Sequence, residues 1–267
     1  SGFLWIGTQE GLNRFDGQRF EVQRRQSDPE AGPVSSSVDA LAHDGRSRLW
    51  IGTNDAGLEV LDLRTGQRLR VGTAQGLSHP TIGDLLLDGA AGAWVGTERG
   101  VDYVDAALSA ARTLAVDLKV VAMARAGGDA FALDARCGLW RLHPERIDPV
   151  PFAAEGFDAC VALQGSAEGL WLATANGEVA LVSAGGTPLR RYERAAASPP
   201  GASVTTLLLR PGGELLLGED DGGVLRQDVR GGGDAHRLAL DQRVGGAIQV
   251  LTQDREGVLW IGTHTRG

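Results

Sequence analysis

The side chains that could perform acid–base chemistry are few and scattered in this 267-residue chain. A histidine and a carboxylate that converge on one surface could act as general base and general acid. Five histidines are present: His43, His79, His143, His236 and His264. We expect only His79 and His264 on ligand-accessible loops, and neither lies in a recognisable catalytic motif. The sequence therefore predicts no catalysis.

Metal and thiol chemistry receive little support either. The adjacent carboxylates Asp220 and Asp221 could attract a cation, but two carboxylates are far from a full oxygen cage. Cys137 and Cys160 are too few for a disulfide framework, and Cys-rich metal spacing is absent. The pattern favours two buried free thiols over a bridge, and it predicts no metal and no cofactor.

Charge and hydropathy exclude two classes of partner. The formal net charge is −8 and no run of Lys or Arg occurs, so nucleic acid is not an expected partner. No segment approaches the roughly 18 consecutive apolar residues of a membrane span. We expect no direct membrane contact by these residues.

The elements that would position a site are set by a repeated five-residue tag. Leu-Trp-Ile-Gly-Thr occurs at 4–8, 49–53 and 259–263, and close variants occur at 93–97 and 170–174. Two degenerate repeats fill the longer gaps. The seven anchor positions, 37 to 45 residues apart, are Trp5, Trp50, Trp94, Phe131, Trp171, Leu216 and Trp260. Such an interval is typical of repeat architectures.

One repeat contains four short strands. In the second repeat, turn residues separate the expected strands at 38–43, 48–53, 58–63 and 67–71. The strand at 58–63 alternates apolar and polar residues, as a half-buried strand should. Four strands in about 45 residues are typical of a β-propeller blade. The tag would be the second strand, with its Trp packed between blades and its Gly where backbones approach closely.

We therefore predict an all-β β-propeller over residues 1–267, with four-stranded antiparallel blades at seven positions. The first blade would lack its inner strand and the last its outer pair, as in a fragment of a longer array. A six-bladed alternative stays open, in which 246–253 supplies the inner strand of blade one and the last tag is left over.

Binding residues are expected on the loops at one rim of the channel, because long loops on a rigid scaffold concentrate function. The hairpins between strands two and three reach this rim, as do the long connections at 24–37, 72–81 and 194–202. The candidate ligand-binding residues are Glu10, Asn54, Asp55, Glu98, Arg99, Arg136, Asn176, Asp220, Asp221, His264 and Arg266. For any single one of them, the role of an ordinary turn residue is the favoured alternative.

Two segments resemble a known family. Asp-Arg-Glu-Gly-Val-Leu-Trp-Ile-Gly-Thr at 254–263, and the stretch 2–16 that ends in Gly-Leu-Asn-Arg-Phe-Asp, are similar to the two-component regulator propeller repeat. The resemblance implies the extracytoplasmic sensor region of a bacterial membrane protein with a histidine kinase or GGDEF output. It also implies a periplasmic location and a homodimer in the full-length protein. No kinase phosphoacceptor box or GGDEF signature occurs in these residues.

The resemblance leaves the stimulus open. It implies an unknown small ligand, with carbohydrate as one class, or a protein. The expected hairpin tips are poor in aromatic residues, which weakens the carbohydrate reading. Two alternatives remain: a protein-interaction scaffold, and a lyase that resembles the seven-bladed enzymes that open cyclic antibiotics.

Overall fold

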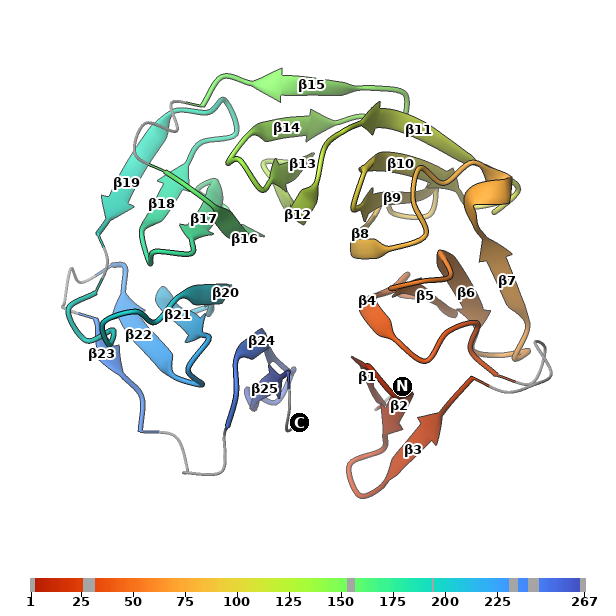
Figure 1. The fold of residues 1–267 in the computed structure, drawn as a ribbon, viewed down its shortest axis with the longest axis horizontal. Coiled ribbons are helices and arrows are strands. Elements are labelled where there is room, and N and C mark those ends of the chain that lie inside the picture. Colours follow the sequence, from red (N-terminus) through yellow and green to blue (C-terminus); the bar gives the residue numbers. More distant parts are fainter. Residues whose placement is uncertain are drawn as a thin grey trace. The chain divides into compact units, whose positions relative to one another are not determined.

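The structure is a computed structural model that describes residues 3–25, 32–152, 157–193, 195–230, 235–239 and 245–264. Its described regular structure is β-strand, apart from one 3-10 turn, η1 (Thr73–Gln75) (Figure 1). The chain divides into a first unit, Ser1–Met123 with Leu142–Asp148, and a second unit, Ala124–Arg141 with Pro149–Gly267. Each unit is described by itself.

Three antiparallel sheets lie wholly in the first unit and follow one another in chain order. The three-stranded sheet has the order β1 (Leu4–Thr8), β2 (Gly11–Phe15), β3 (Phe20–Gln23). The next sheet is β4 (Val38–His43), β5 (Arg48–Thr53), β6 (Leu58–Asp62), β7 (Arg68–Val71). The third is β8 (Ile82–Leu87), β9 (Gly92–Thr97), β10 (Gly100–Asp105), β11 (Ala111–Val116).

The remaining sheets repeat this order. One consists of β12 (Val120–Ala126), β13 (Asp129–Asp134), β14 (Leu139–Leu142) and β15 (Ile147–Val150). In the second unit follow β16 (Cys160–Gly165), β17 (Leu170–Thr174), β18 (Val179–Val182) and β19 (Pro188–Tyr192). The last two sheets are β20 (Val204–Leu209), β21 (Glu214–Glu219), β22 (Val224–Asp228), β23 (His236–Arg237), and the pair β24 (Ile248–Gln253), β25 (Leu259–Thr263).

These sheets confirm the predicted β-propeller with seven blade positions. Among the described residues, the first sheet consists of second, third and fourth strands, and the last consists of an inner strand and a tag strand. Phe131 and Leu216, which replace the tag Trp, lie on β13 and β21, the second strands of their sheets. In the second unit β24 pairs with the last tag strand β25, so that tag is not left over as the six-bladed alternative requires.

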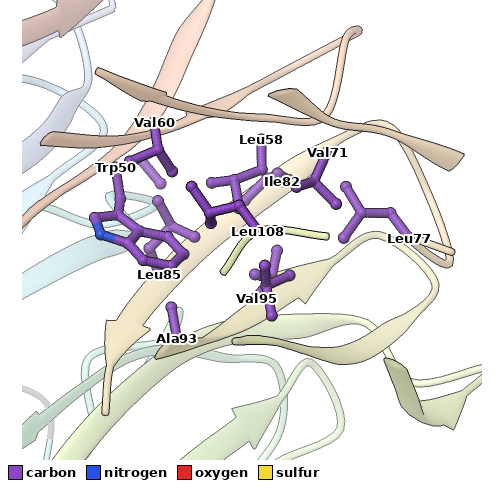
Figure 2. Close-up of a cluster of buried hydrophobic side chains, with 12 residues drawn as sticks. Trp50, Leu58, Val60, Val71, Leu77, Ile82, Leu85, Ala93, Val95 and Leu108 are labelled. Atoms are coloured by element: carbon purple, nitrogen blue, oxygen red, sulfur yellow. The ribbon is translucent and has the colours of Figure 1, made fainter. Parts of the chain in front are cut away.

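The tag is a packing element whose side chains point to both faces of its sheet. Trp50 is 3% exposed and packs with Ile82, Leu85 and Val95 of the following sheet (Figure 2). Ile51, the next residue, packs on the opposite face against Leu12 of the preceding sheet. Burying an indole contributes up to about 4–6 kcal/mol to the stability of the fold. The tag residues therefore serve packing rather than ligand binding.

Because both faces are covered, one prediction about polar residues was wrong. The alternation along β6 was expected to leave its polar side chains in solvent, yet Glu59 is 0% exposed. An interior sheet of a propeller has a neighbouring sheet on each face. A polar residue in such a strand is therefore buried and needs partners.

The turn before the tag explains a recurrent aspartate. The Oδ1 atom of Asp44 accepts the backbone N–H groups of Arg46, Ser47 and Arg48 at 2.8, 2.9 and 3.0 Å. Burial works to raise the pKa of Asp44, but these hydrogen bonds outweigh it and lower the pKa. Asp254 repeats the arrangement and also accepts the indole N–H of Trp260 at 2.8 Å.

The tag glycine receives the first side chain of the next sheet. A Cβ on Gly52 would lie 2.6 Å from Cγ2 of Ile82, and a Cβ on Gly218 would lie 2.6 Å from Cγ2 of Ile248. Such distances are shorter than a carbon–carbon contact allows, so a side chain cannot be added without displacing the next strand. The close approach at Gly52 and Gly218 is therefore made by side chains of the neighbouring strands, where the sequence predicted facing backbones.

Two tags have another residue in place of this glycine, Leu133 on β13 and Ala173 on β17, and the junction after β13 is built differently. Leu133 takes the glycine position on β13, and the next inner strand begins with Cys160 where other sheets have Val or Ile. Cys160 forms a disulfide with Cys137 in the turn between β13 and β14, with the two Cα atoms 5.0 Å apart. The expectation of two free thiols was wrong, because the repeat register brings each such turn to the start of the next sheet.

Candidate functional site

The hairpin tips between second and third strands were the predicted site, and the tag threonine shapes them. The Oγ1 of Thr53 donates to the carbonyl of Gly57 at 2.8 Å and accepts the N–H of Ala56 at 3.0 Å. Thr97 contacts Gly100 in the same way. The tag threonine therefore closes the tip that would carry a binding residue.

Candidate residues of the first unit form local polar contacts. Glu10 pairs with Arg24 at 3.1 Å, and the side-chain amide of Asn54 donates to Asp39 at 2.8 Å. Asp55 is exposed at the same tip as Asn54. These tips thus present polar, hydrated side chains.

The next tip continues the pattern. Glu98 forms an ion pair with Lys119 at 3.0 Å, and Arg99 lies 3.8 Å from Asp117. Both pairs are exposed and join the tip to the segment that follows β11.

In the second unit, the acidic pair at 220–221 is already engaged. Asp220 Oδ1 accepts the N–H of Ser203 at 2.8 Å. Both carboxylate oxygens of Asp221 accept Arg237 Nη2 at 2.7 Å. Burial works to raise the pKa of Asp221, but the bond from Arg237 and the N–H of Gly223 lower it overall. An arginine therefore occupies the place a cation would take.

The remaining predicted residues serve turn geometry. The N–H of Arg136 donates to Asp134 at 2.8 Å, Asn176 accepts the hydroxyl of Thr174, and the N–H of His264 donates to the carbonyl of Ala247 at 3.0 Å. Arg266 lies outside the described residues. Within the described ranges, no group of three or more His, Cys, Asp or Glu side chains is arranged to hold a metal ion.

Buried carboxylates hold the long connecting loops, and the sequence analysis missed them. Glu59 accepts the N–H of Val34, in the connection before β4, at 2.8 Å. Its charge is balanced by Arg68 and by Arg70, whose Nε lies 3.2 Å from Oε2. The Arg68 side chain is itself only 8% exposed.

Asp102 holds the connection at 72–81 from the equivalent place. Its Oδ2 accepts the N–H of Ser78 at 2.9 Å and the Ser78 hydroxyl at 2.8 Å. The Ser78 hydroxyl also lies 2.9 Å from Thr97 Oγ1. Asp102 is 0% exposed, and burial raises the pKa of its carboxyl despite the hydrogen bonds that oppose the shift.

The third long connection, 194–202, shows a similar anchor. Ser198 Oγ donates to Glu219, which occupies the tag threonine position at the end of β21. Arg237 Nη1 lies 3.6 Å from Glu219 Oε2, so this buried carboxylate has a cation beside it.

A sequence signal for the first two anchors exists. Glu59 stands opposite Ile51, and Asp102 stands opposite Val95, the tag aliphatic of the next repeat. An acidic residue at this third-strand position faces a covered surface, and a buried carboxylate must find donors. Reading the third strands in register would have identified both anchors.

Two further features complete the first unit. Asp84 on β8 accepts the N–H of Leu85 at 2.8 Å and that of Met123 on β12 at 2.5 Å, and burial raises its pKa to about 6. A groove of about 560 Å³ lies beside Trp5 and Phe3, where the Arg14 guanidinium stacks 4.6 Å from the Phe3 ring. This groove is at the opposite end of β1 and β2 from Glu10.

Comparison with known proteins agrees with this architecture. Residues 243–265 match the family described as two component regulator propeller. The chain is a β-propeller, and the matched residues include the segment 254–263 on which the resemblance rests, which bears out that resemblance. No curated protein matches the chain in sequence.

Solved structures with a similar fold include the extracellular domains of two bacterial proteins. The extracellular domain of the putative hybrid two component system BT3049 from B. thetaiotaomicron aligns with 100% of this chain and 38% of its own, at 20% identity and TM-score 0.78. The extracellular domain of the putative one component system BT4673 from the same organism aligns with 98% of this chain and 36% of its own, at 17% identity and TM-score 0.75. The WD40 propeller of Doa1 aligns with 99% and 86% at 12% identity and TM-score 0.71.

The chain therefore spans less than two-fifths of the length of these two extracellular domains. At these identities the similarity establishes the fold. Among the described residues, no helix has the length and apolarity needed to cross a bilayer.

Proposed function

We propose that this propeller is the periplasmic sensing input of a bacterial transmembrane signalling protein of the two-component or diguanylate cyclase type. The observation that carries the proposal is the regulator propeller repeat at 243–265 within a fold similar to extracellular domains of such systems. The propeller itself would perform no catalysis. It would pass a binding event to an output domain, as a homodimer in the full-length protein.

The disulfide supports the extracytoplasmic placement. Disulfides persist in oxidising compartments such as the periplasm and are rare in the cytosol. Cys137 and Cys160 are 1% and 2% exposed, so the bridge has the character of a structural link between two sheets. Thiol labelling after denaturation would find this bridge oxidised in protein exported to the periplasm. Two labelled thiols in exported protein would contradict the placement.

The ligand would bind on the channel-mouth loops. In the first unit, Ser78 of the 72–81 connection hydrogen-bonds to the tag Thr97, and the N–H of Glu98 at the tip donates to Thr81 at 3.3 Å. A loop that is held in place before the ligand arrives favours affinity, because ordering a loop on binding has a free-energy cost. A small polar ligand, including a carbohydrate, fits the polar tips.

A protein-interaction scaffold is the second candidate. It is favoured by exposed apolar side chains on β3, where Phe20 is 58% and Val22 is 46% exposed. Large exposed apolar groups mark contact surfaces more often than small-molecule sites.

A thermal-shift screen against oligosaccharides, peptides and divalent ions separates the two candidates. We expect a saturable rise in melting temperature with one ligand class, lost in Asp55→Ala or Glu98→Ala. The matched control is Arg64→Ala, an exposed residue in a turn between third and fourth strands, which should keep the shift. A shift lost only in Phe20→Ser would instead support the scaffold, and a shift unaffected by every tip variant would contradict the proposed site.

A further inference from the structure

The connection at 72–81 covers a buried carboxylate that has hydroxyl and backbone partners. Asp102 lies on β10, and Ser78 reaches it with both its N–H and its hydroxyl. Leu77, the preceding residue, is 4% exposed and packs in the cluster with Leu58 and Val71. The loop in this position lies against Asp102, which is 0% exposed.

No cationic side chain is paired with Asp102 among the described residues. Its hydrogen-bond partners are Ser78 of the loop and Thr113 of β11, and the Ser78 hydroxyl also contacts Thr97 of β9; all three side chains are uncharged. Transfer of an unpaired carboxylate into a protein interior is costly, and protonation relieves the cost.

The titratable side chains on the surrounding elements have other contacts. The Nδ1 of His79 accepts the N–H of Thr81 at 3.2 Å, and Arg112 donates to the carbonyl of Pro144. Glu98 and Arg99 are engaged with Lys119 and Asp117, as described above. None of these charges is directed at Asp102, so its protonation depends on burial and its uncharged partners.

We infer that the 72–81 loop closes over Asp102 with uptake of a proton, which makes this loop a pH-sensitive element of the propeller. In the open state the carboxyl is hydrated and titrates near its ordinary value of 3.8. In the closed state its pKa is raised. The state with the raised pKa binds the proton more tightly, so acidification favours closure.

The sign and the pH window follow from the ordinary pKa of the open state and the raised pKa of the closed state. The proton-linked stabilisation of the closed loop is complete below the open-state pKa and is lost as pH rises through the closed-state pKa. A ligand that needs the loop closed would bind more tightly at lower pH, whatever its chemistry. The inference therefore stands independently of the proposed sensory function.

The connection held by Glu59 is an internal control. Its carboxylate also anchors a loop through a backbone N–H, that of Val34, but it is compensated by Arg68 and Arg70. A paired carboxylate stays ionised when its loop is closed. Closure over Glu59 should not take up a proton in the neutral range.

Hydrogen exchange of the whole chain tests the inference. The amide of Ser78 is measured at pH 5.0 and pH 7.5, with rates corrected for intrinsic exchange, and the amide of Val34 serves as the reference. We expect the protection factor of Ser78 to rise several-fold on acidification while that of Val34 is unchanged. Protection of Ser78 that is constant or falls on acidification would overturn the inference.

A variant and a direct titration show whether Asp102 is the group responsible for the pH effect. In Asp102→Asn the Ser78 amide should be protected equally at both pH values, and a surviving pH effect would assign it to another group. If the variant does not fold, a carbon-13 carboxyl titration of Asp102 in the unmodified chain decides. A value at or below 3.8 would contradict proton-linked closure.

Discussion

Two loop anchors of the first unit, Glu59 and Asp102, occupy equivalent places and solve the same problem differently. Each lies on the third strand of its sheet, opposite the aliphatic residue that follows the tag Trp on the second strand. Each accepts a hydrogen bond from a backbone N–H of the loop that precedes its sheet or lies against it, Val34 for Glu59 and Ser78 for Asp102. Glu59 lies between two arginines, whereas Asp102 is met by hydroxyl groups. The difference teaches that the same hydrogen bond can serve as a permanent or as a proton-dependent attachment.

The presence or absence of a neighbouring cation, rather than the hydrogen bond to the loop, decides whether the attachment depends on a proton. A carboxylate paired with arginine keeps its charge on burial, while one without a cation has its ionised form disfavoured. Asp102, which has no paired cation among the described residues, lies in the same sheet as Asp84. The third sheet therefore holds two carboxyl groups whose pKa is raised by burial.

The largest expected effect is at the compensated anchor. Glu59→Gln leaves the guanidinium groups of Arg68 and Arg70 without their counter-charge in a mostly buried place. We expect the free energy of unfolding to fall by about 3–5 kcal/mol, as when one partner of a buried pair is removed. Urea denaturation at pH 7.5 measures it. The exposed pair Arg14–Glu21 is the control, because Glu21→Gln should cost less than about 1 kcal/mol.

Ser78→Ala tests the uncompensated anchor from the loop side. The substitution removes the hydroxyl that bonds to Asp102 and Thr97 but keeps the backbone N–H. We expect a loss of about 1.5–3 kcal/mol at neutral pH, the range for hydrogen bonds to charged groups. The loss should shrink at pH 5.0, where Asp102 is closer to neutral. An equal loss at both pH values would show that the charge on Asp102 does not matter.

Asp102→Asn should have the smallest effect at neutral pH. The neutral amide keeps an oxygen that can accept from Ser78 and removes the buried charge. We expect a change in unfolding free energy within about 1 kcal/mol at pH 7.5, including a gain in stability. A loss as large as that of Glu59→Gln would show that the two anchors are equivalent and would remove the comparison.

The architecture could be predicted from sequence because its signal is periodic. The tag recurs at the interval of one four-stranded sheet, and Phe131 and Leu216 keep that phase on β13 and β21. A close approach at the tag glycine was also predictable, but the partner is a side chain, Ile82 or Ile248, rather than the expected backbone. These features repeat, so each copy supports the others.

Features that occur at one junction were not predictable by the same means. The disulfide replaces the glycine contact at Leu133, and only the three-dimensional register brings Cys137 to Cys160. Glu59 was missed because the alternation along β6 was taken to indicate solvent exposure on one face of the strand. The hairpin-tip candidates, such as Asp55 and Glu98, stay predictions that ligand binding must test.

The most direct test of the account is the pH dependence of the stability difference between the unmodified chain and Asp102→Asn. Urea unfolding of both proteins at pH 5.0 and 7.5 isolates this carboxyl, because the other titrating groups, Asp84 included, are common to both. The account predicts that Asp102→Asn gains stability relative to the unmodified chain as pH rises from 5.0 to 7.5. A difference that stays constant or moves the other way would contradict it.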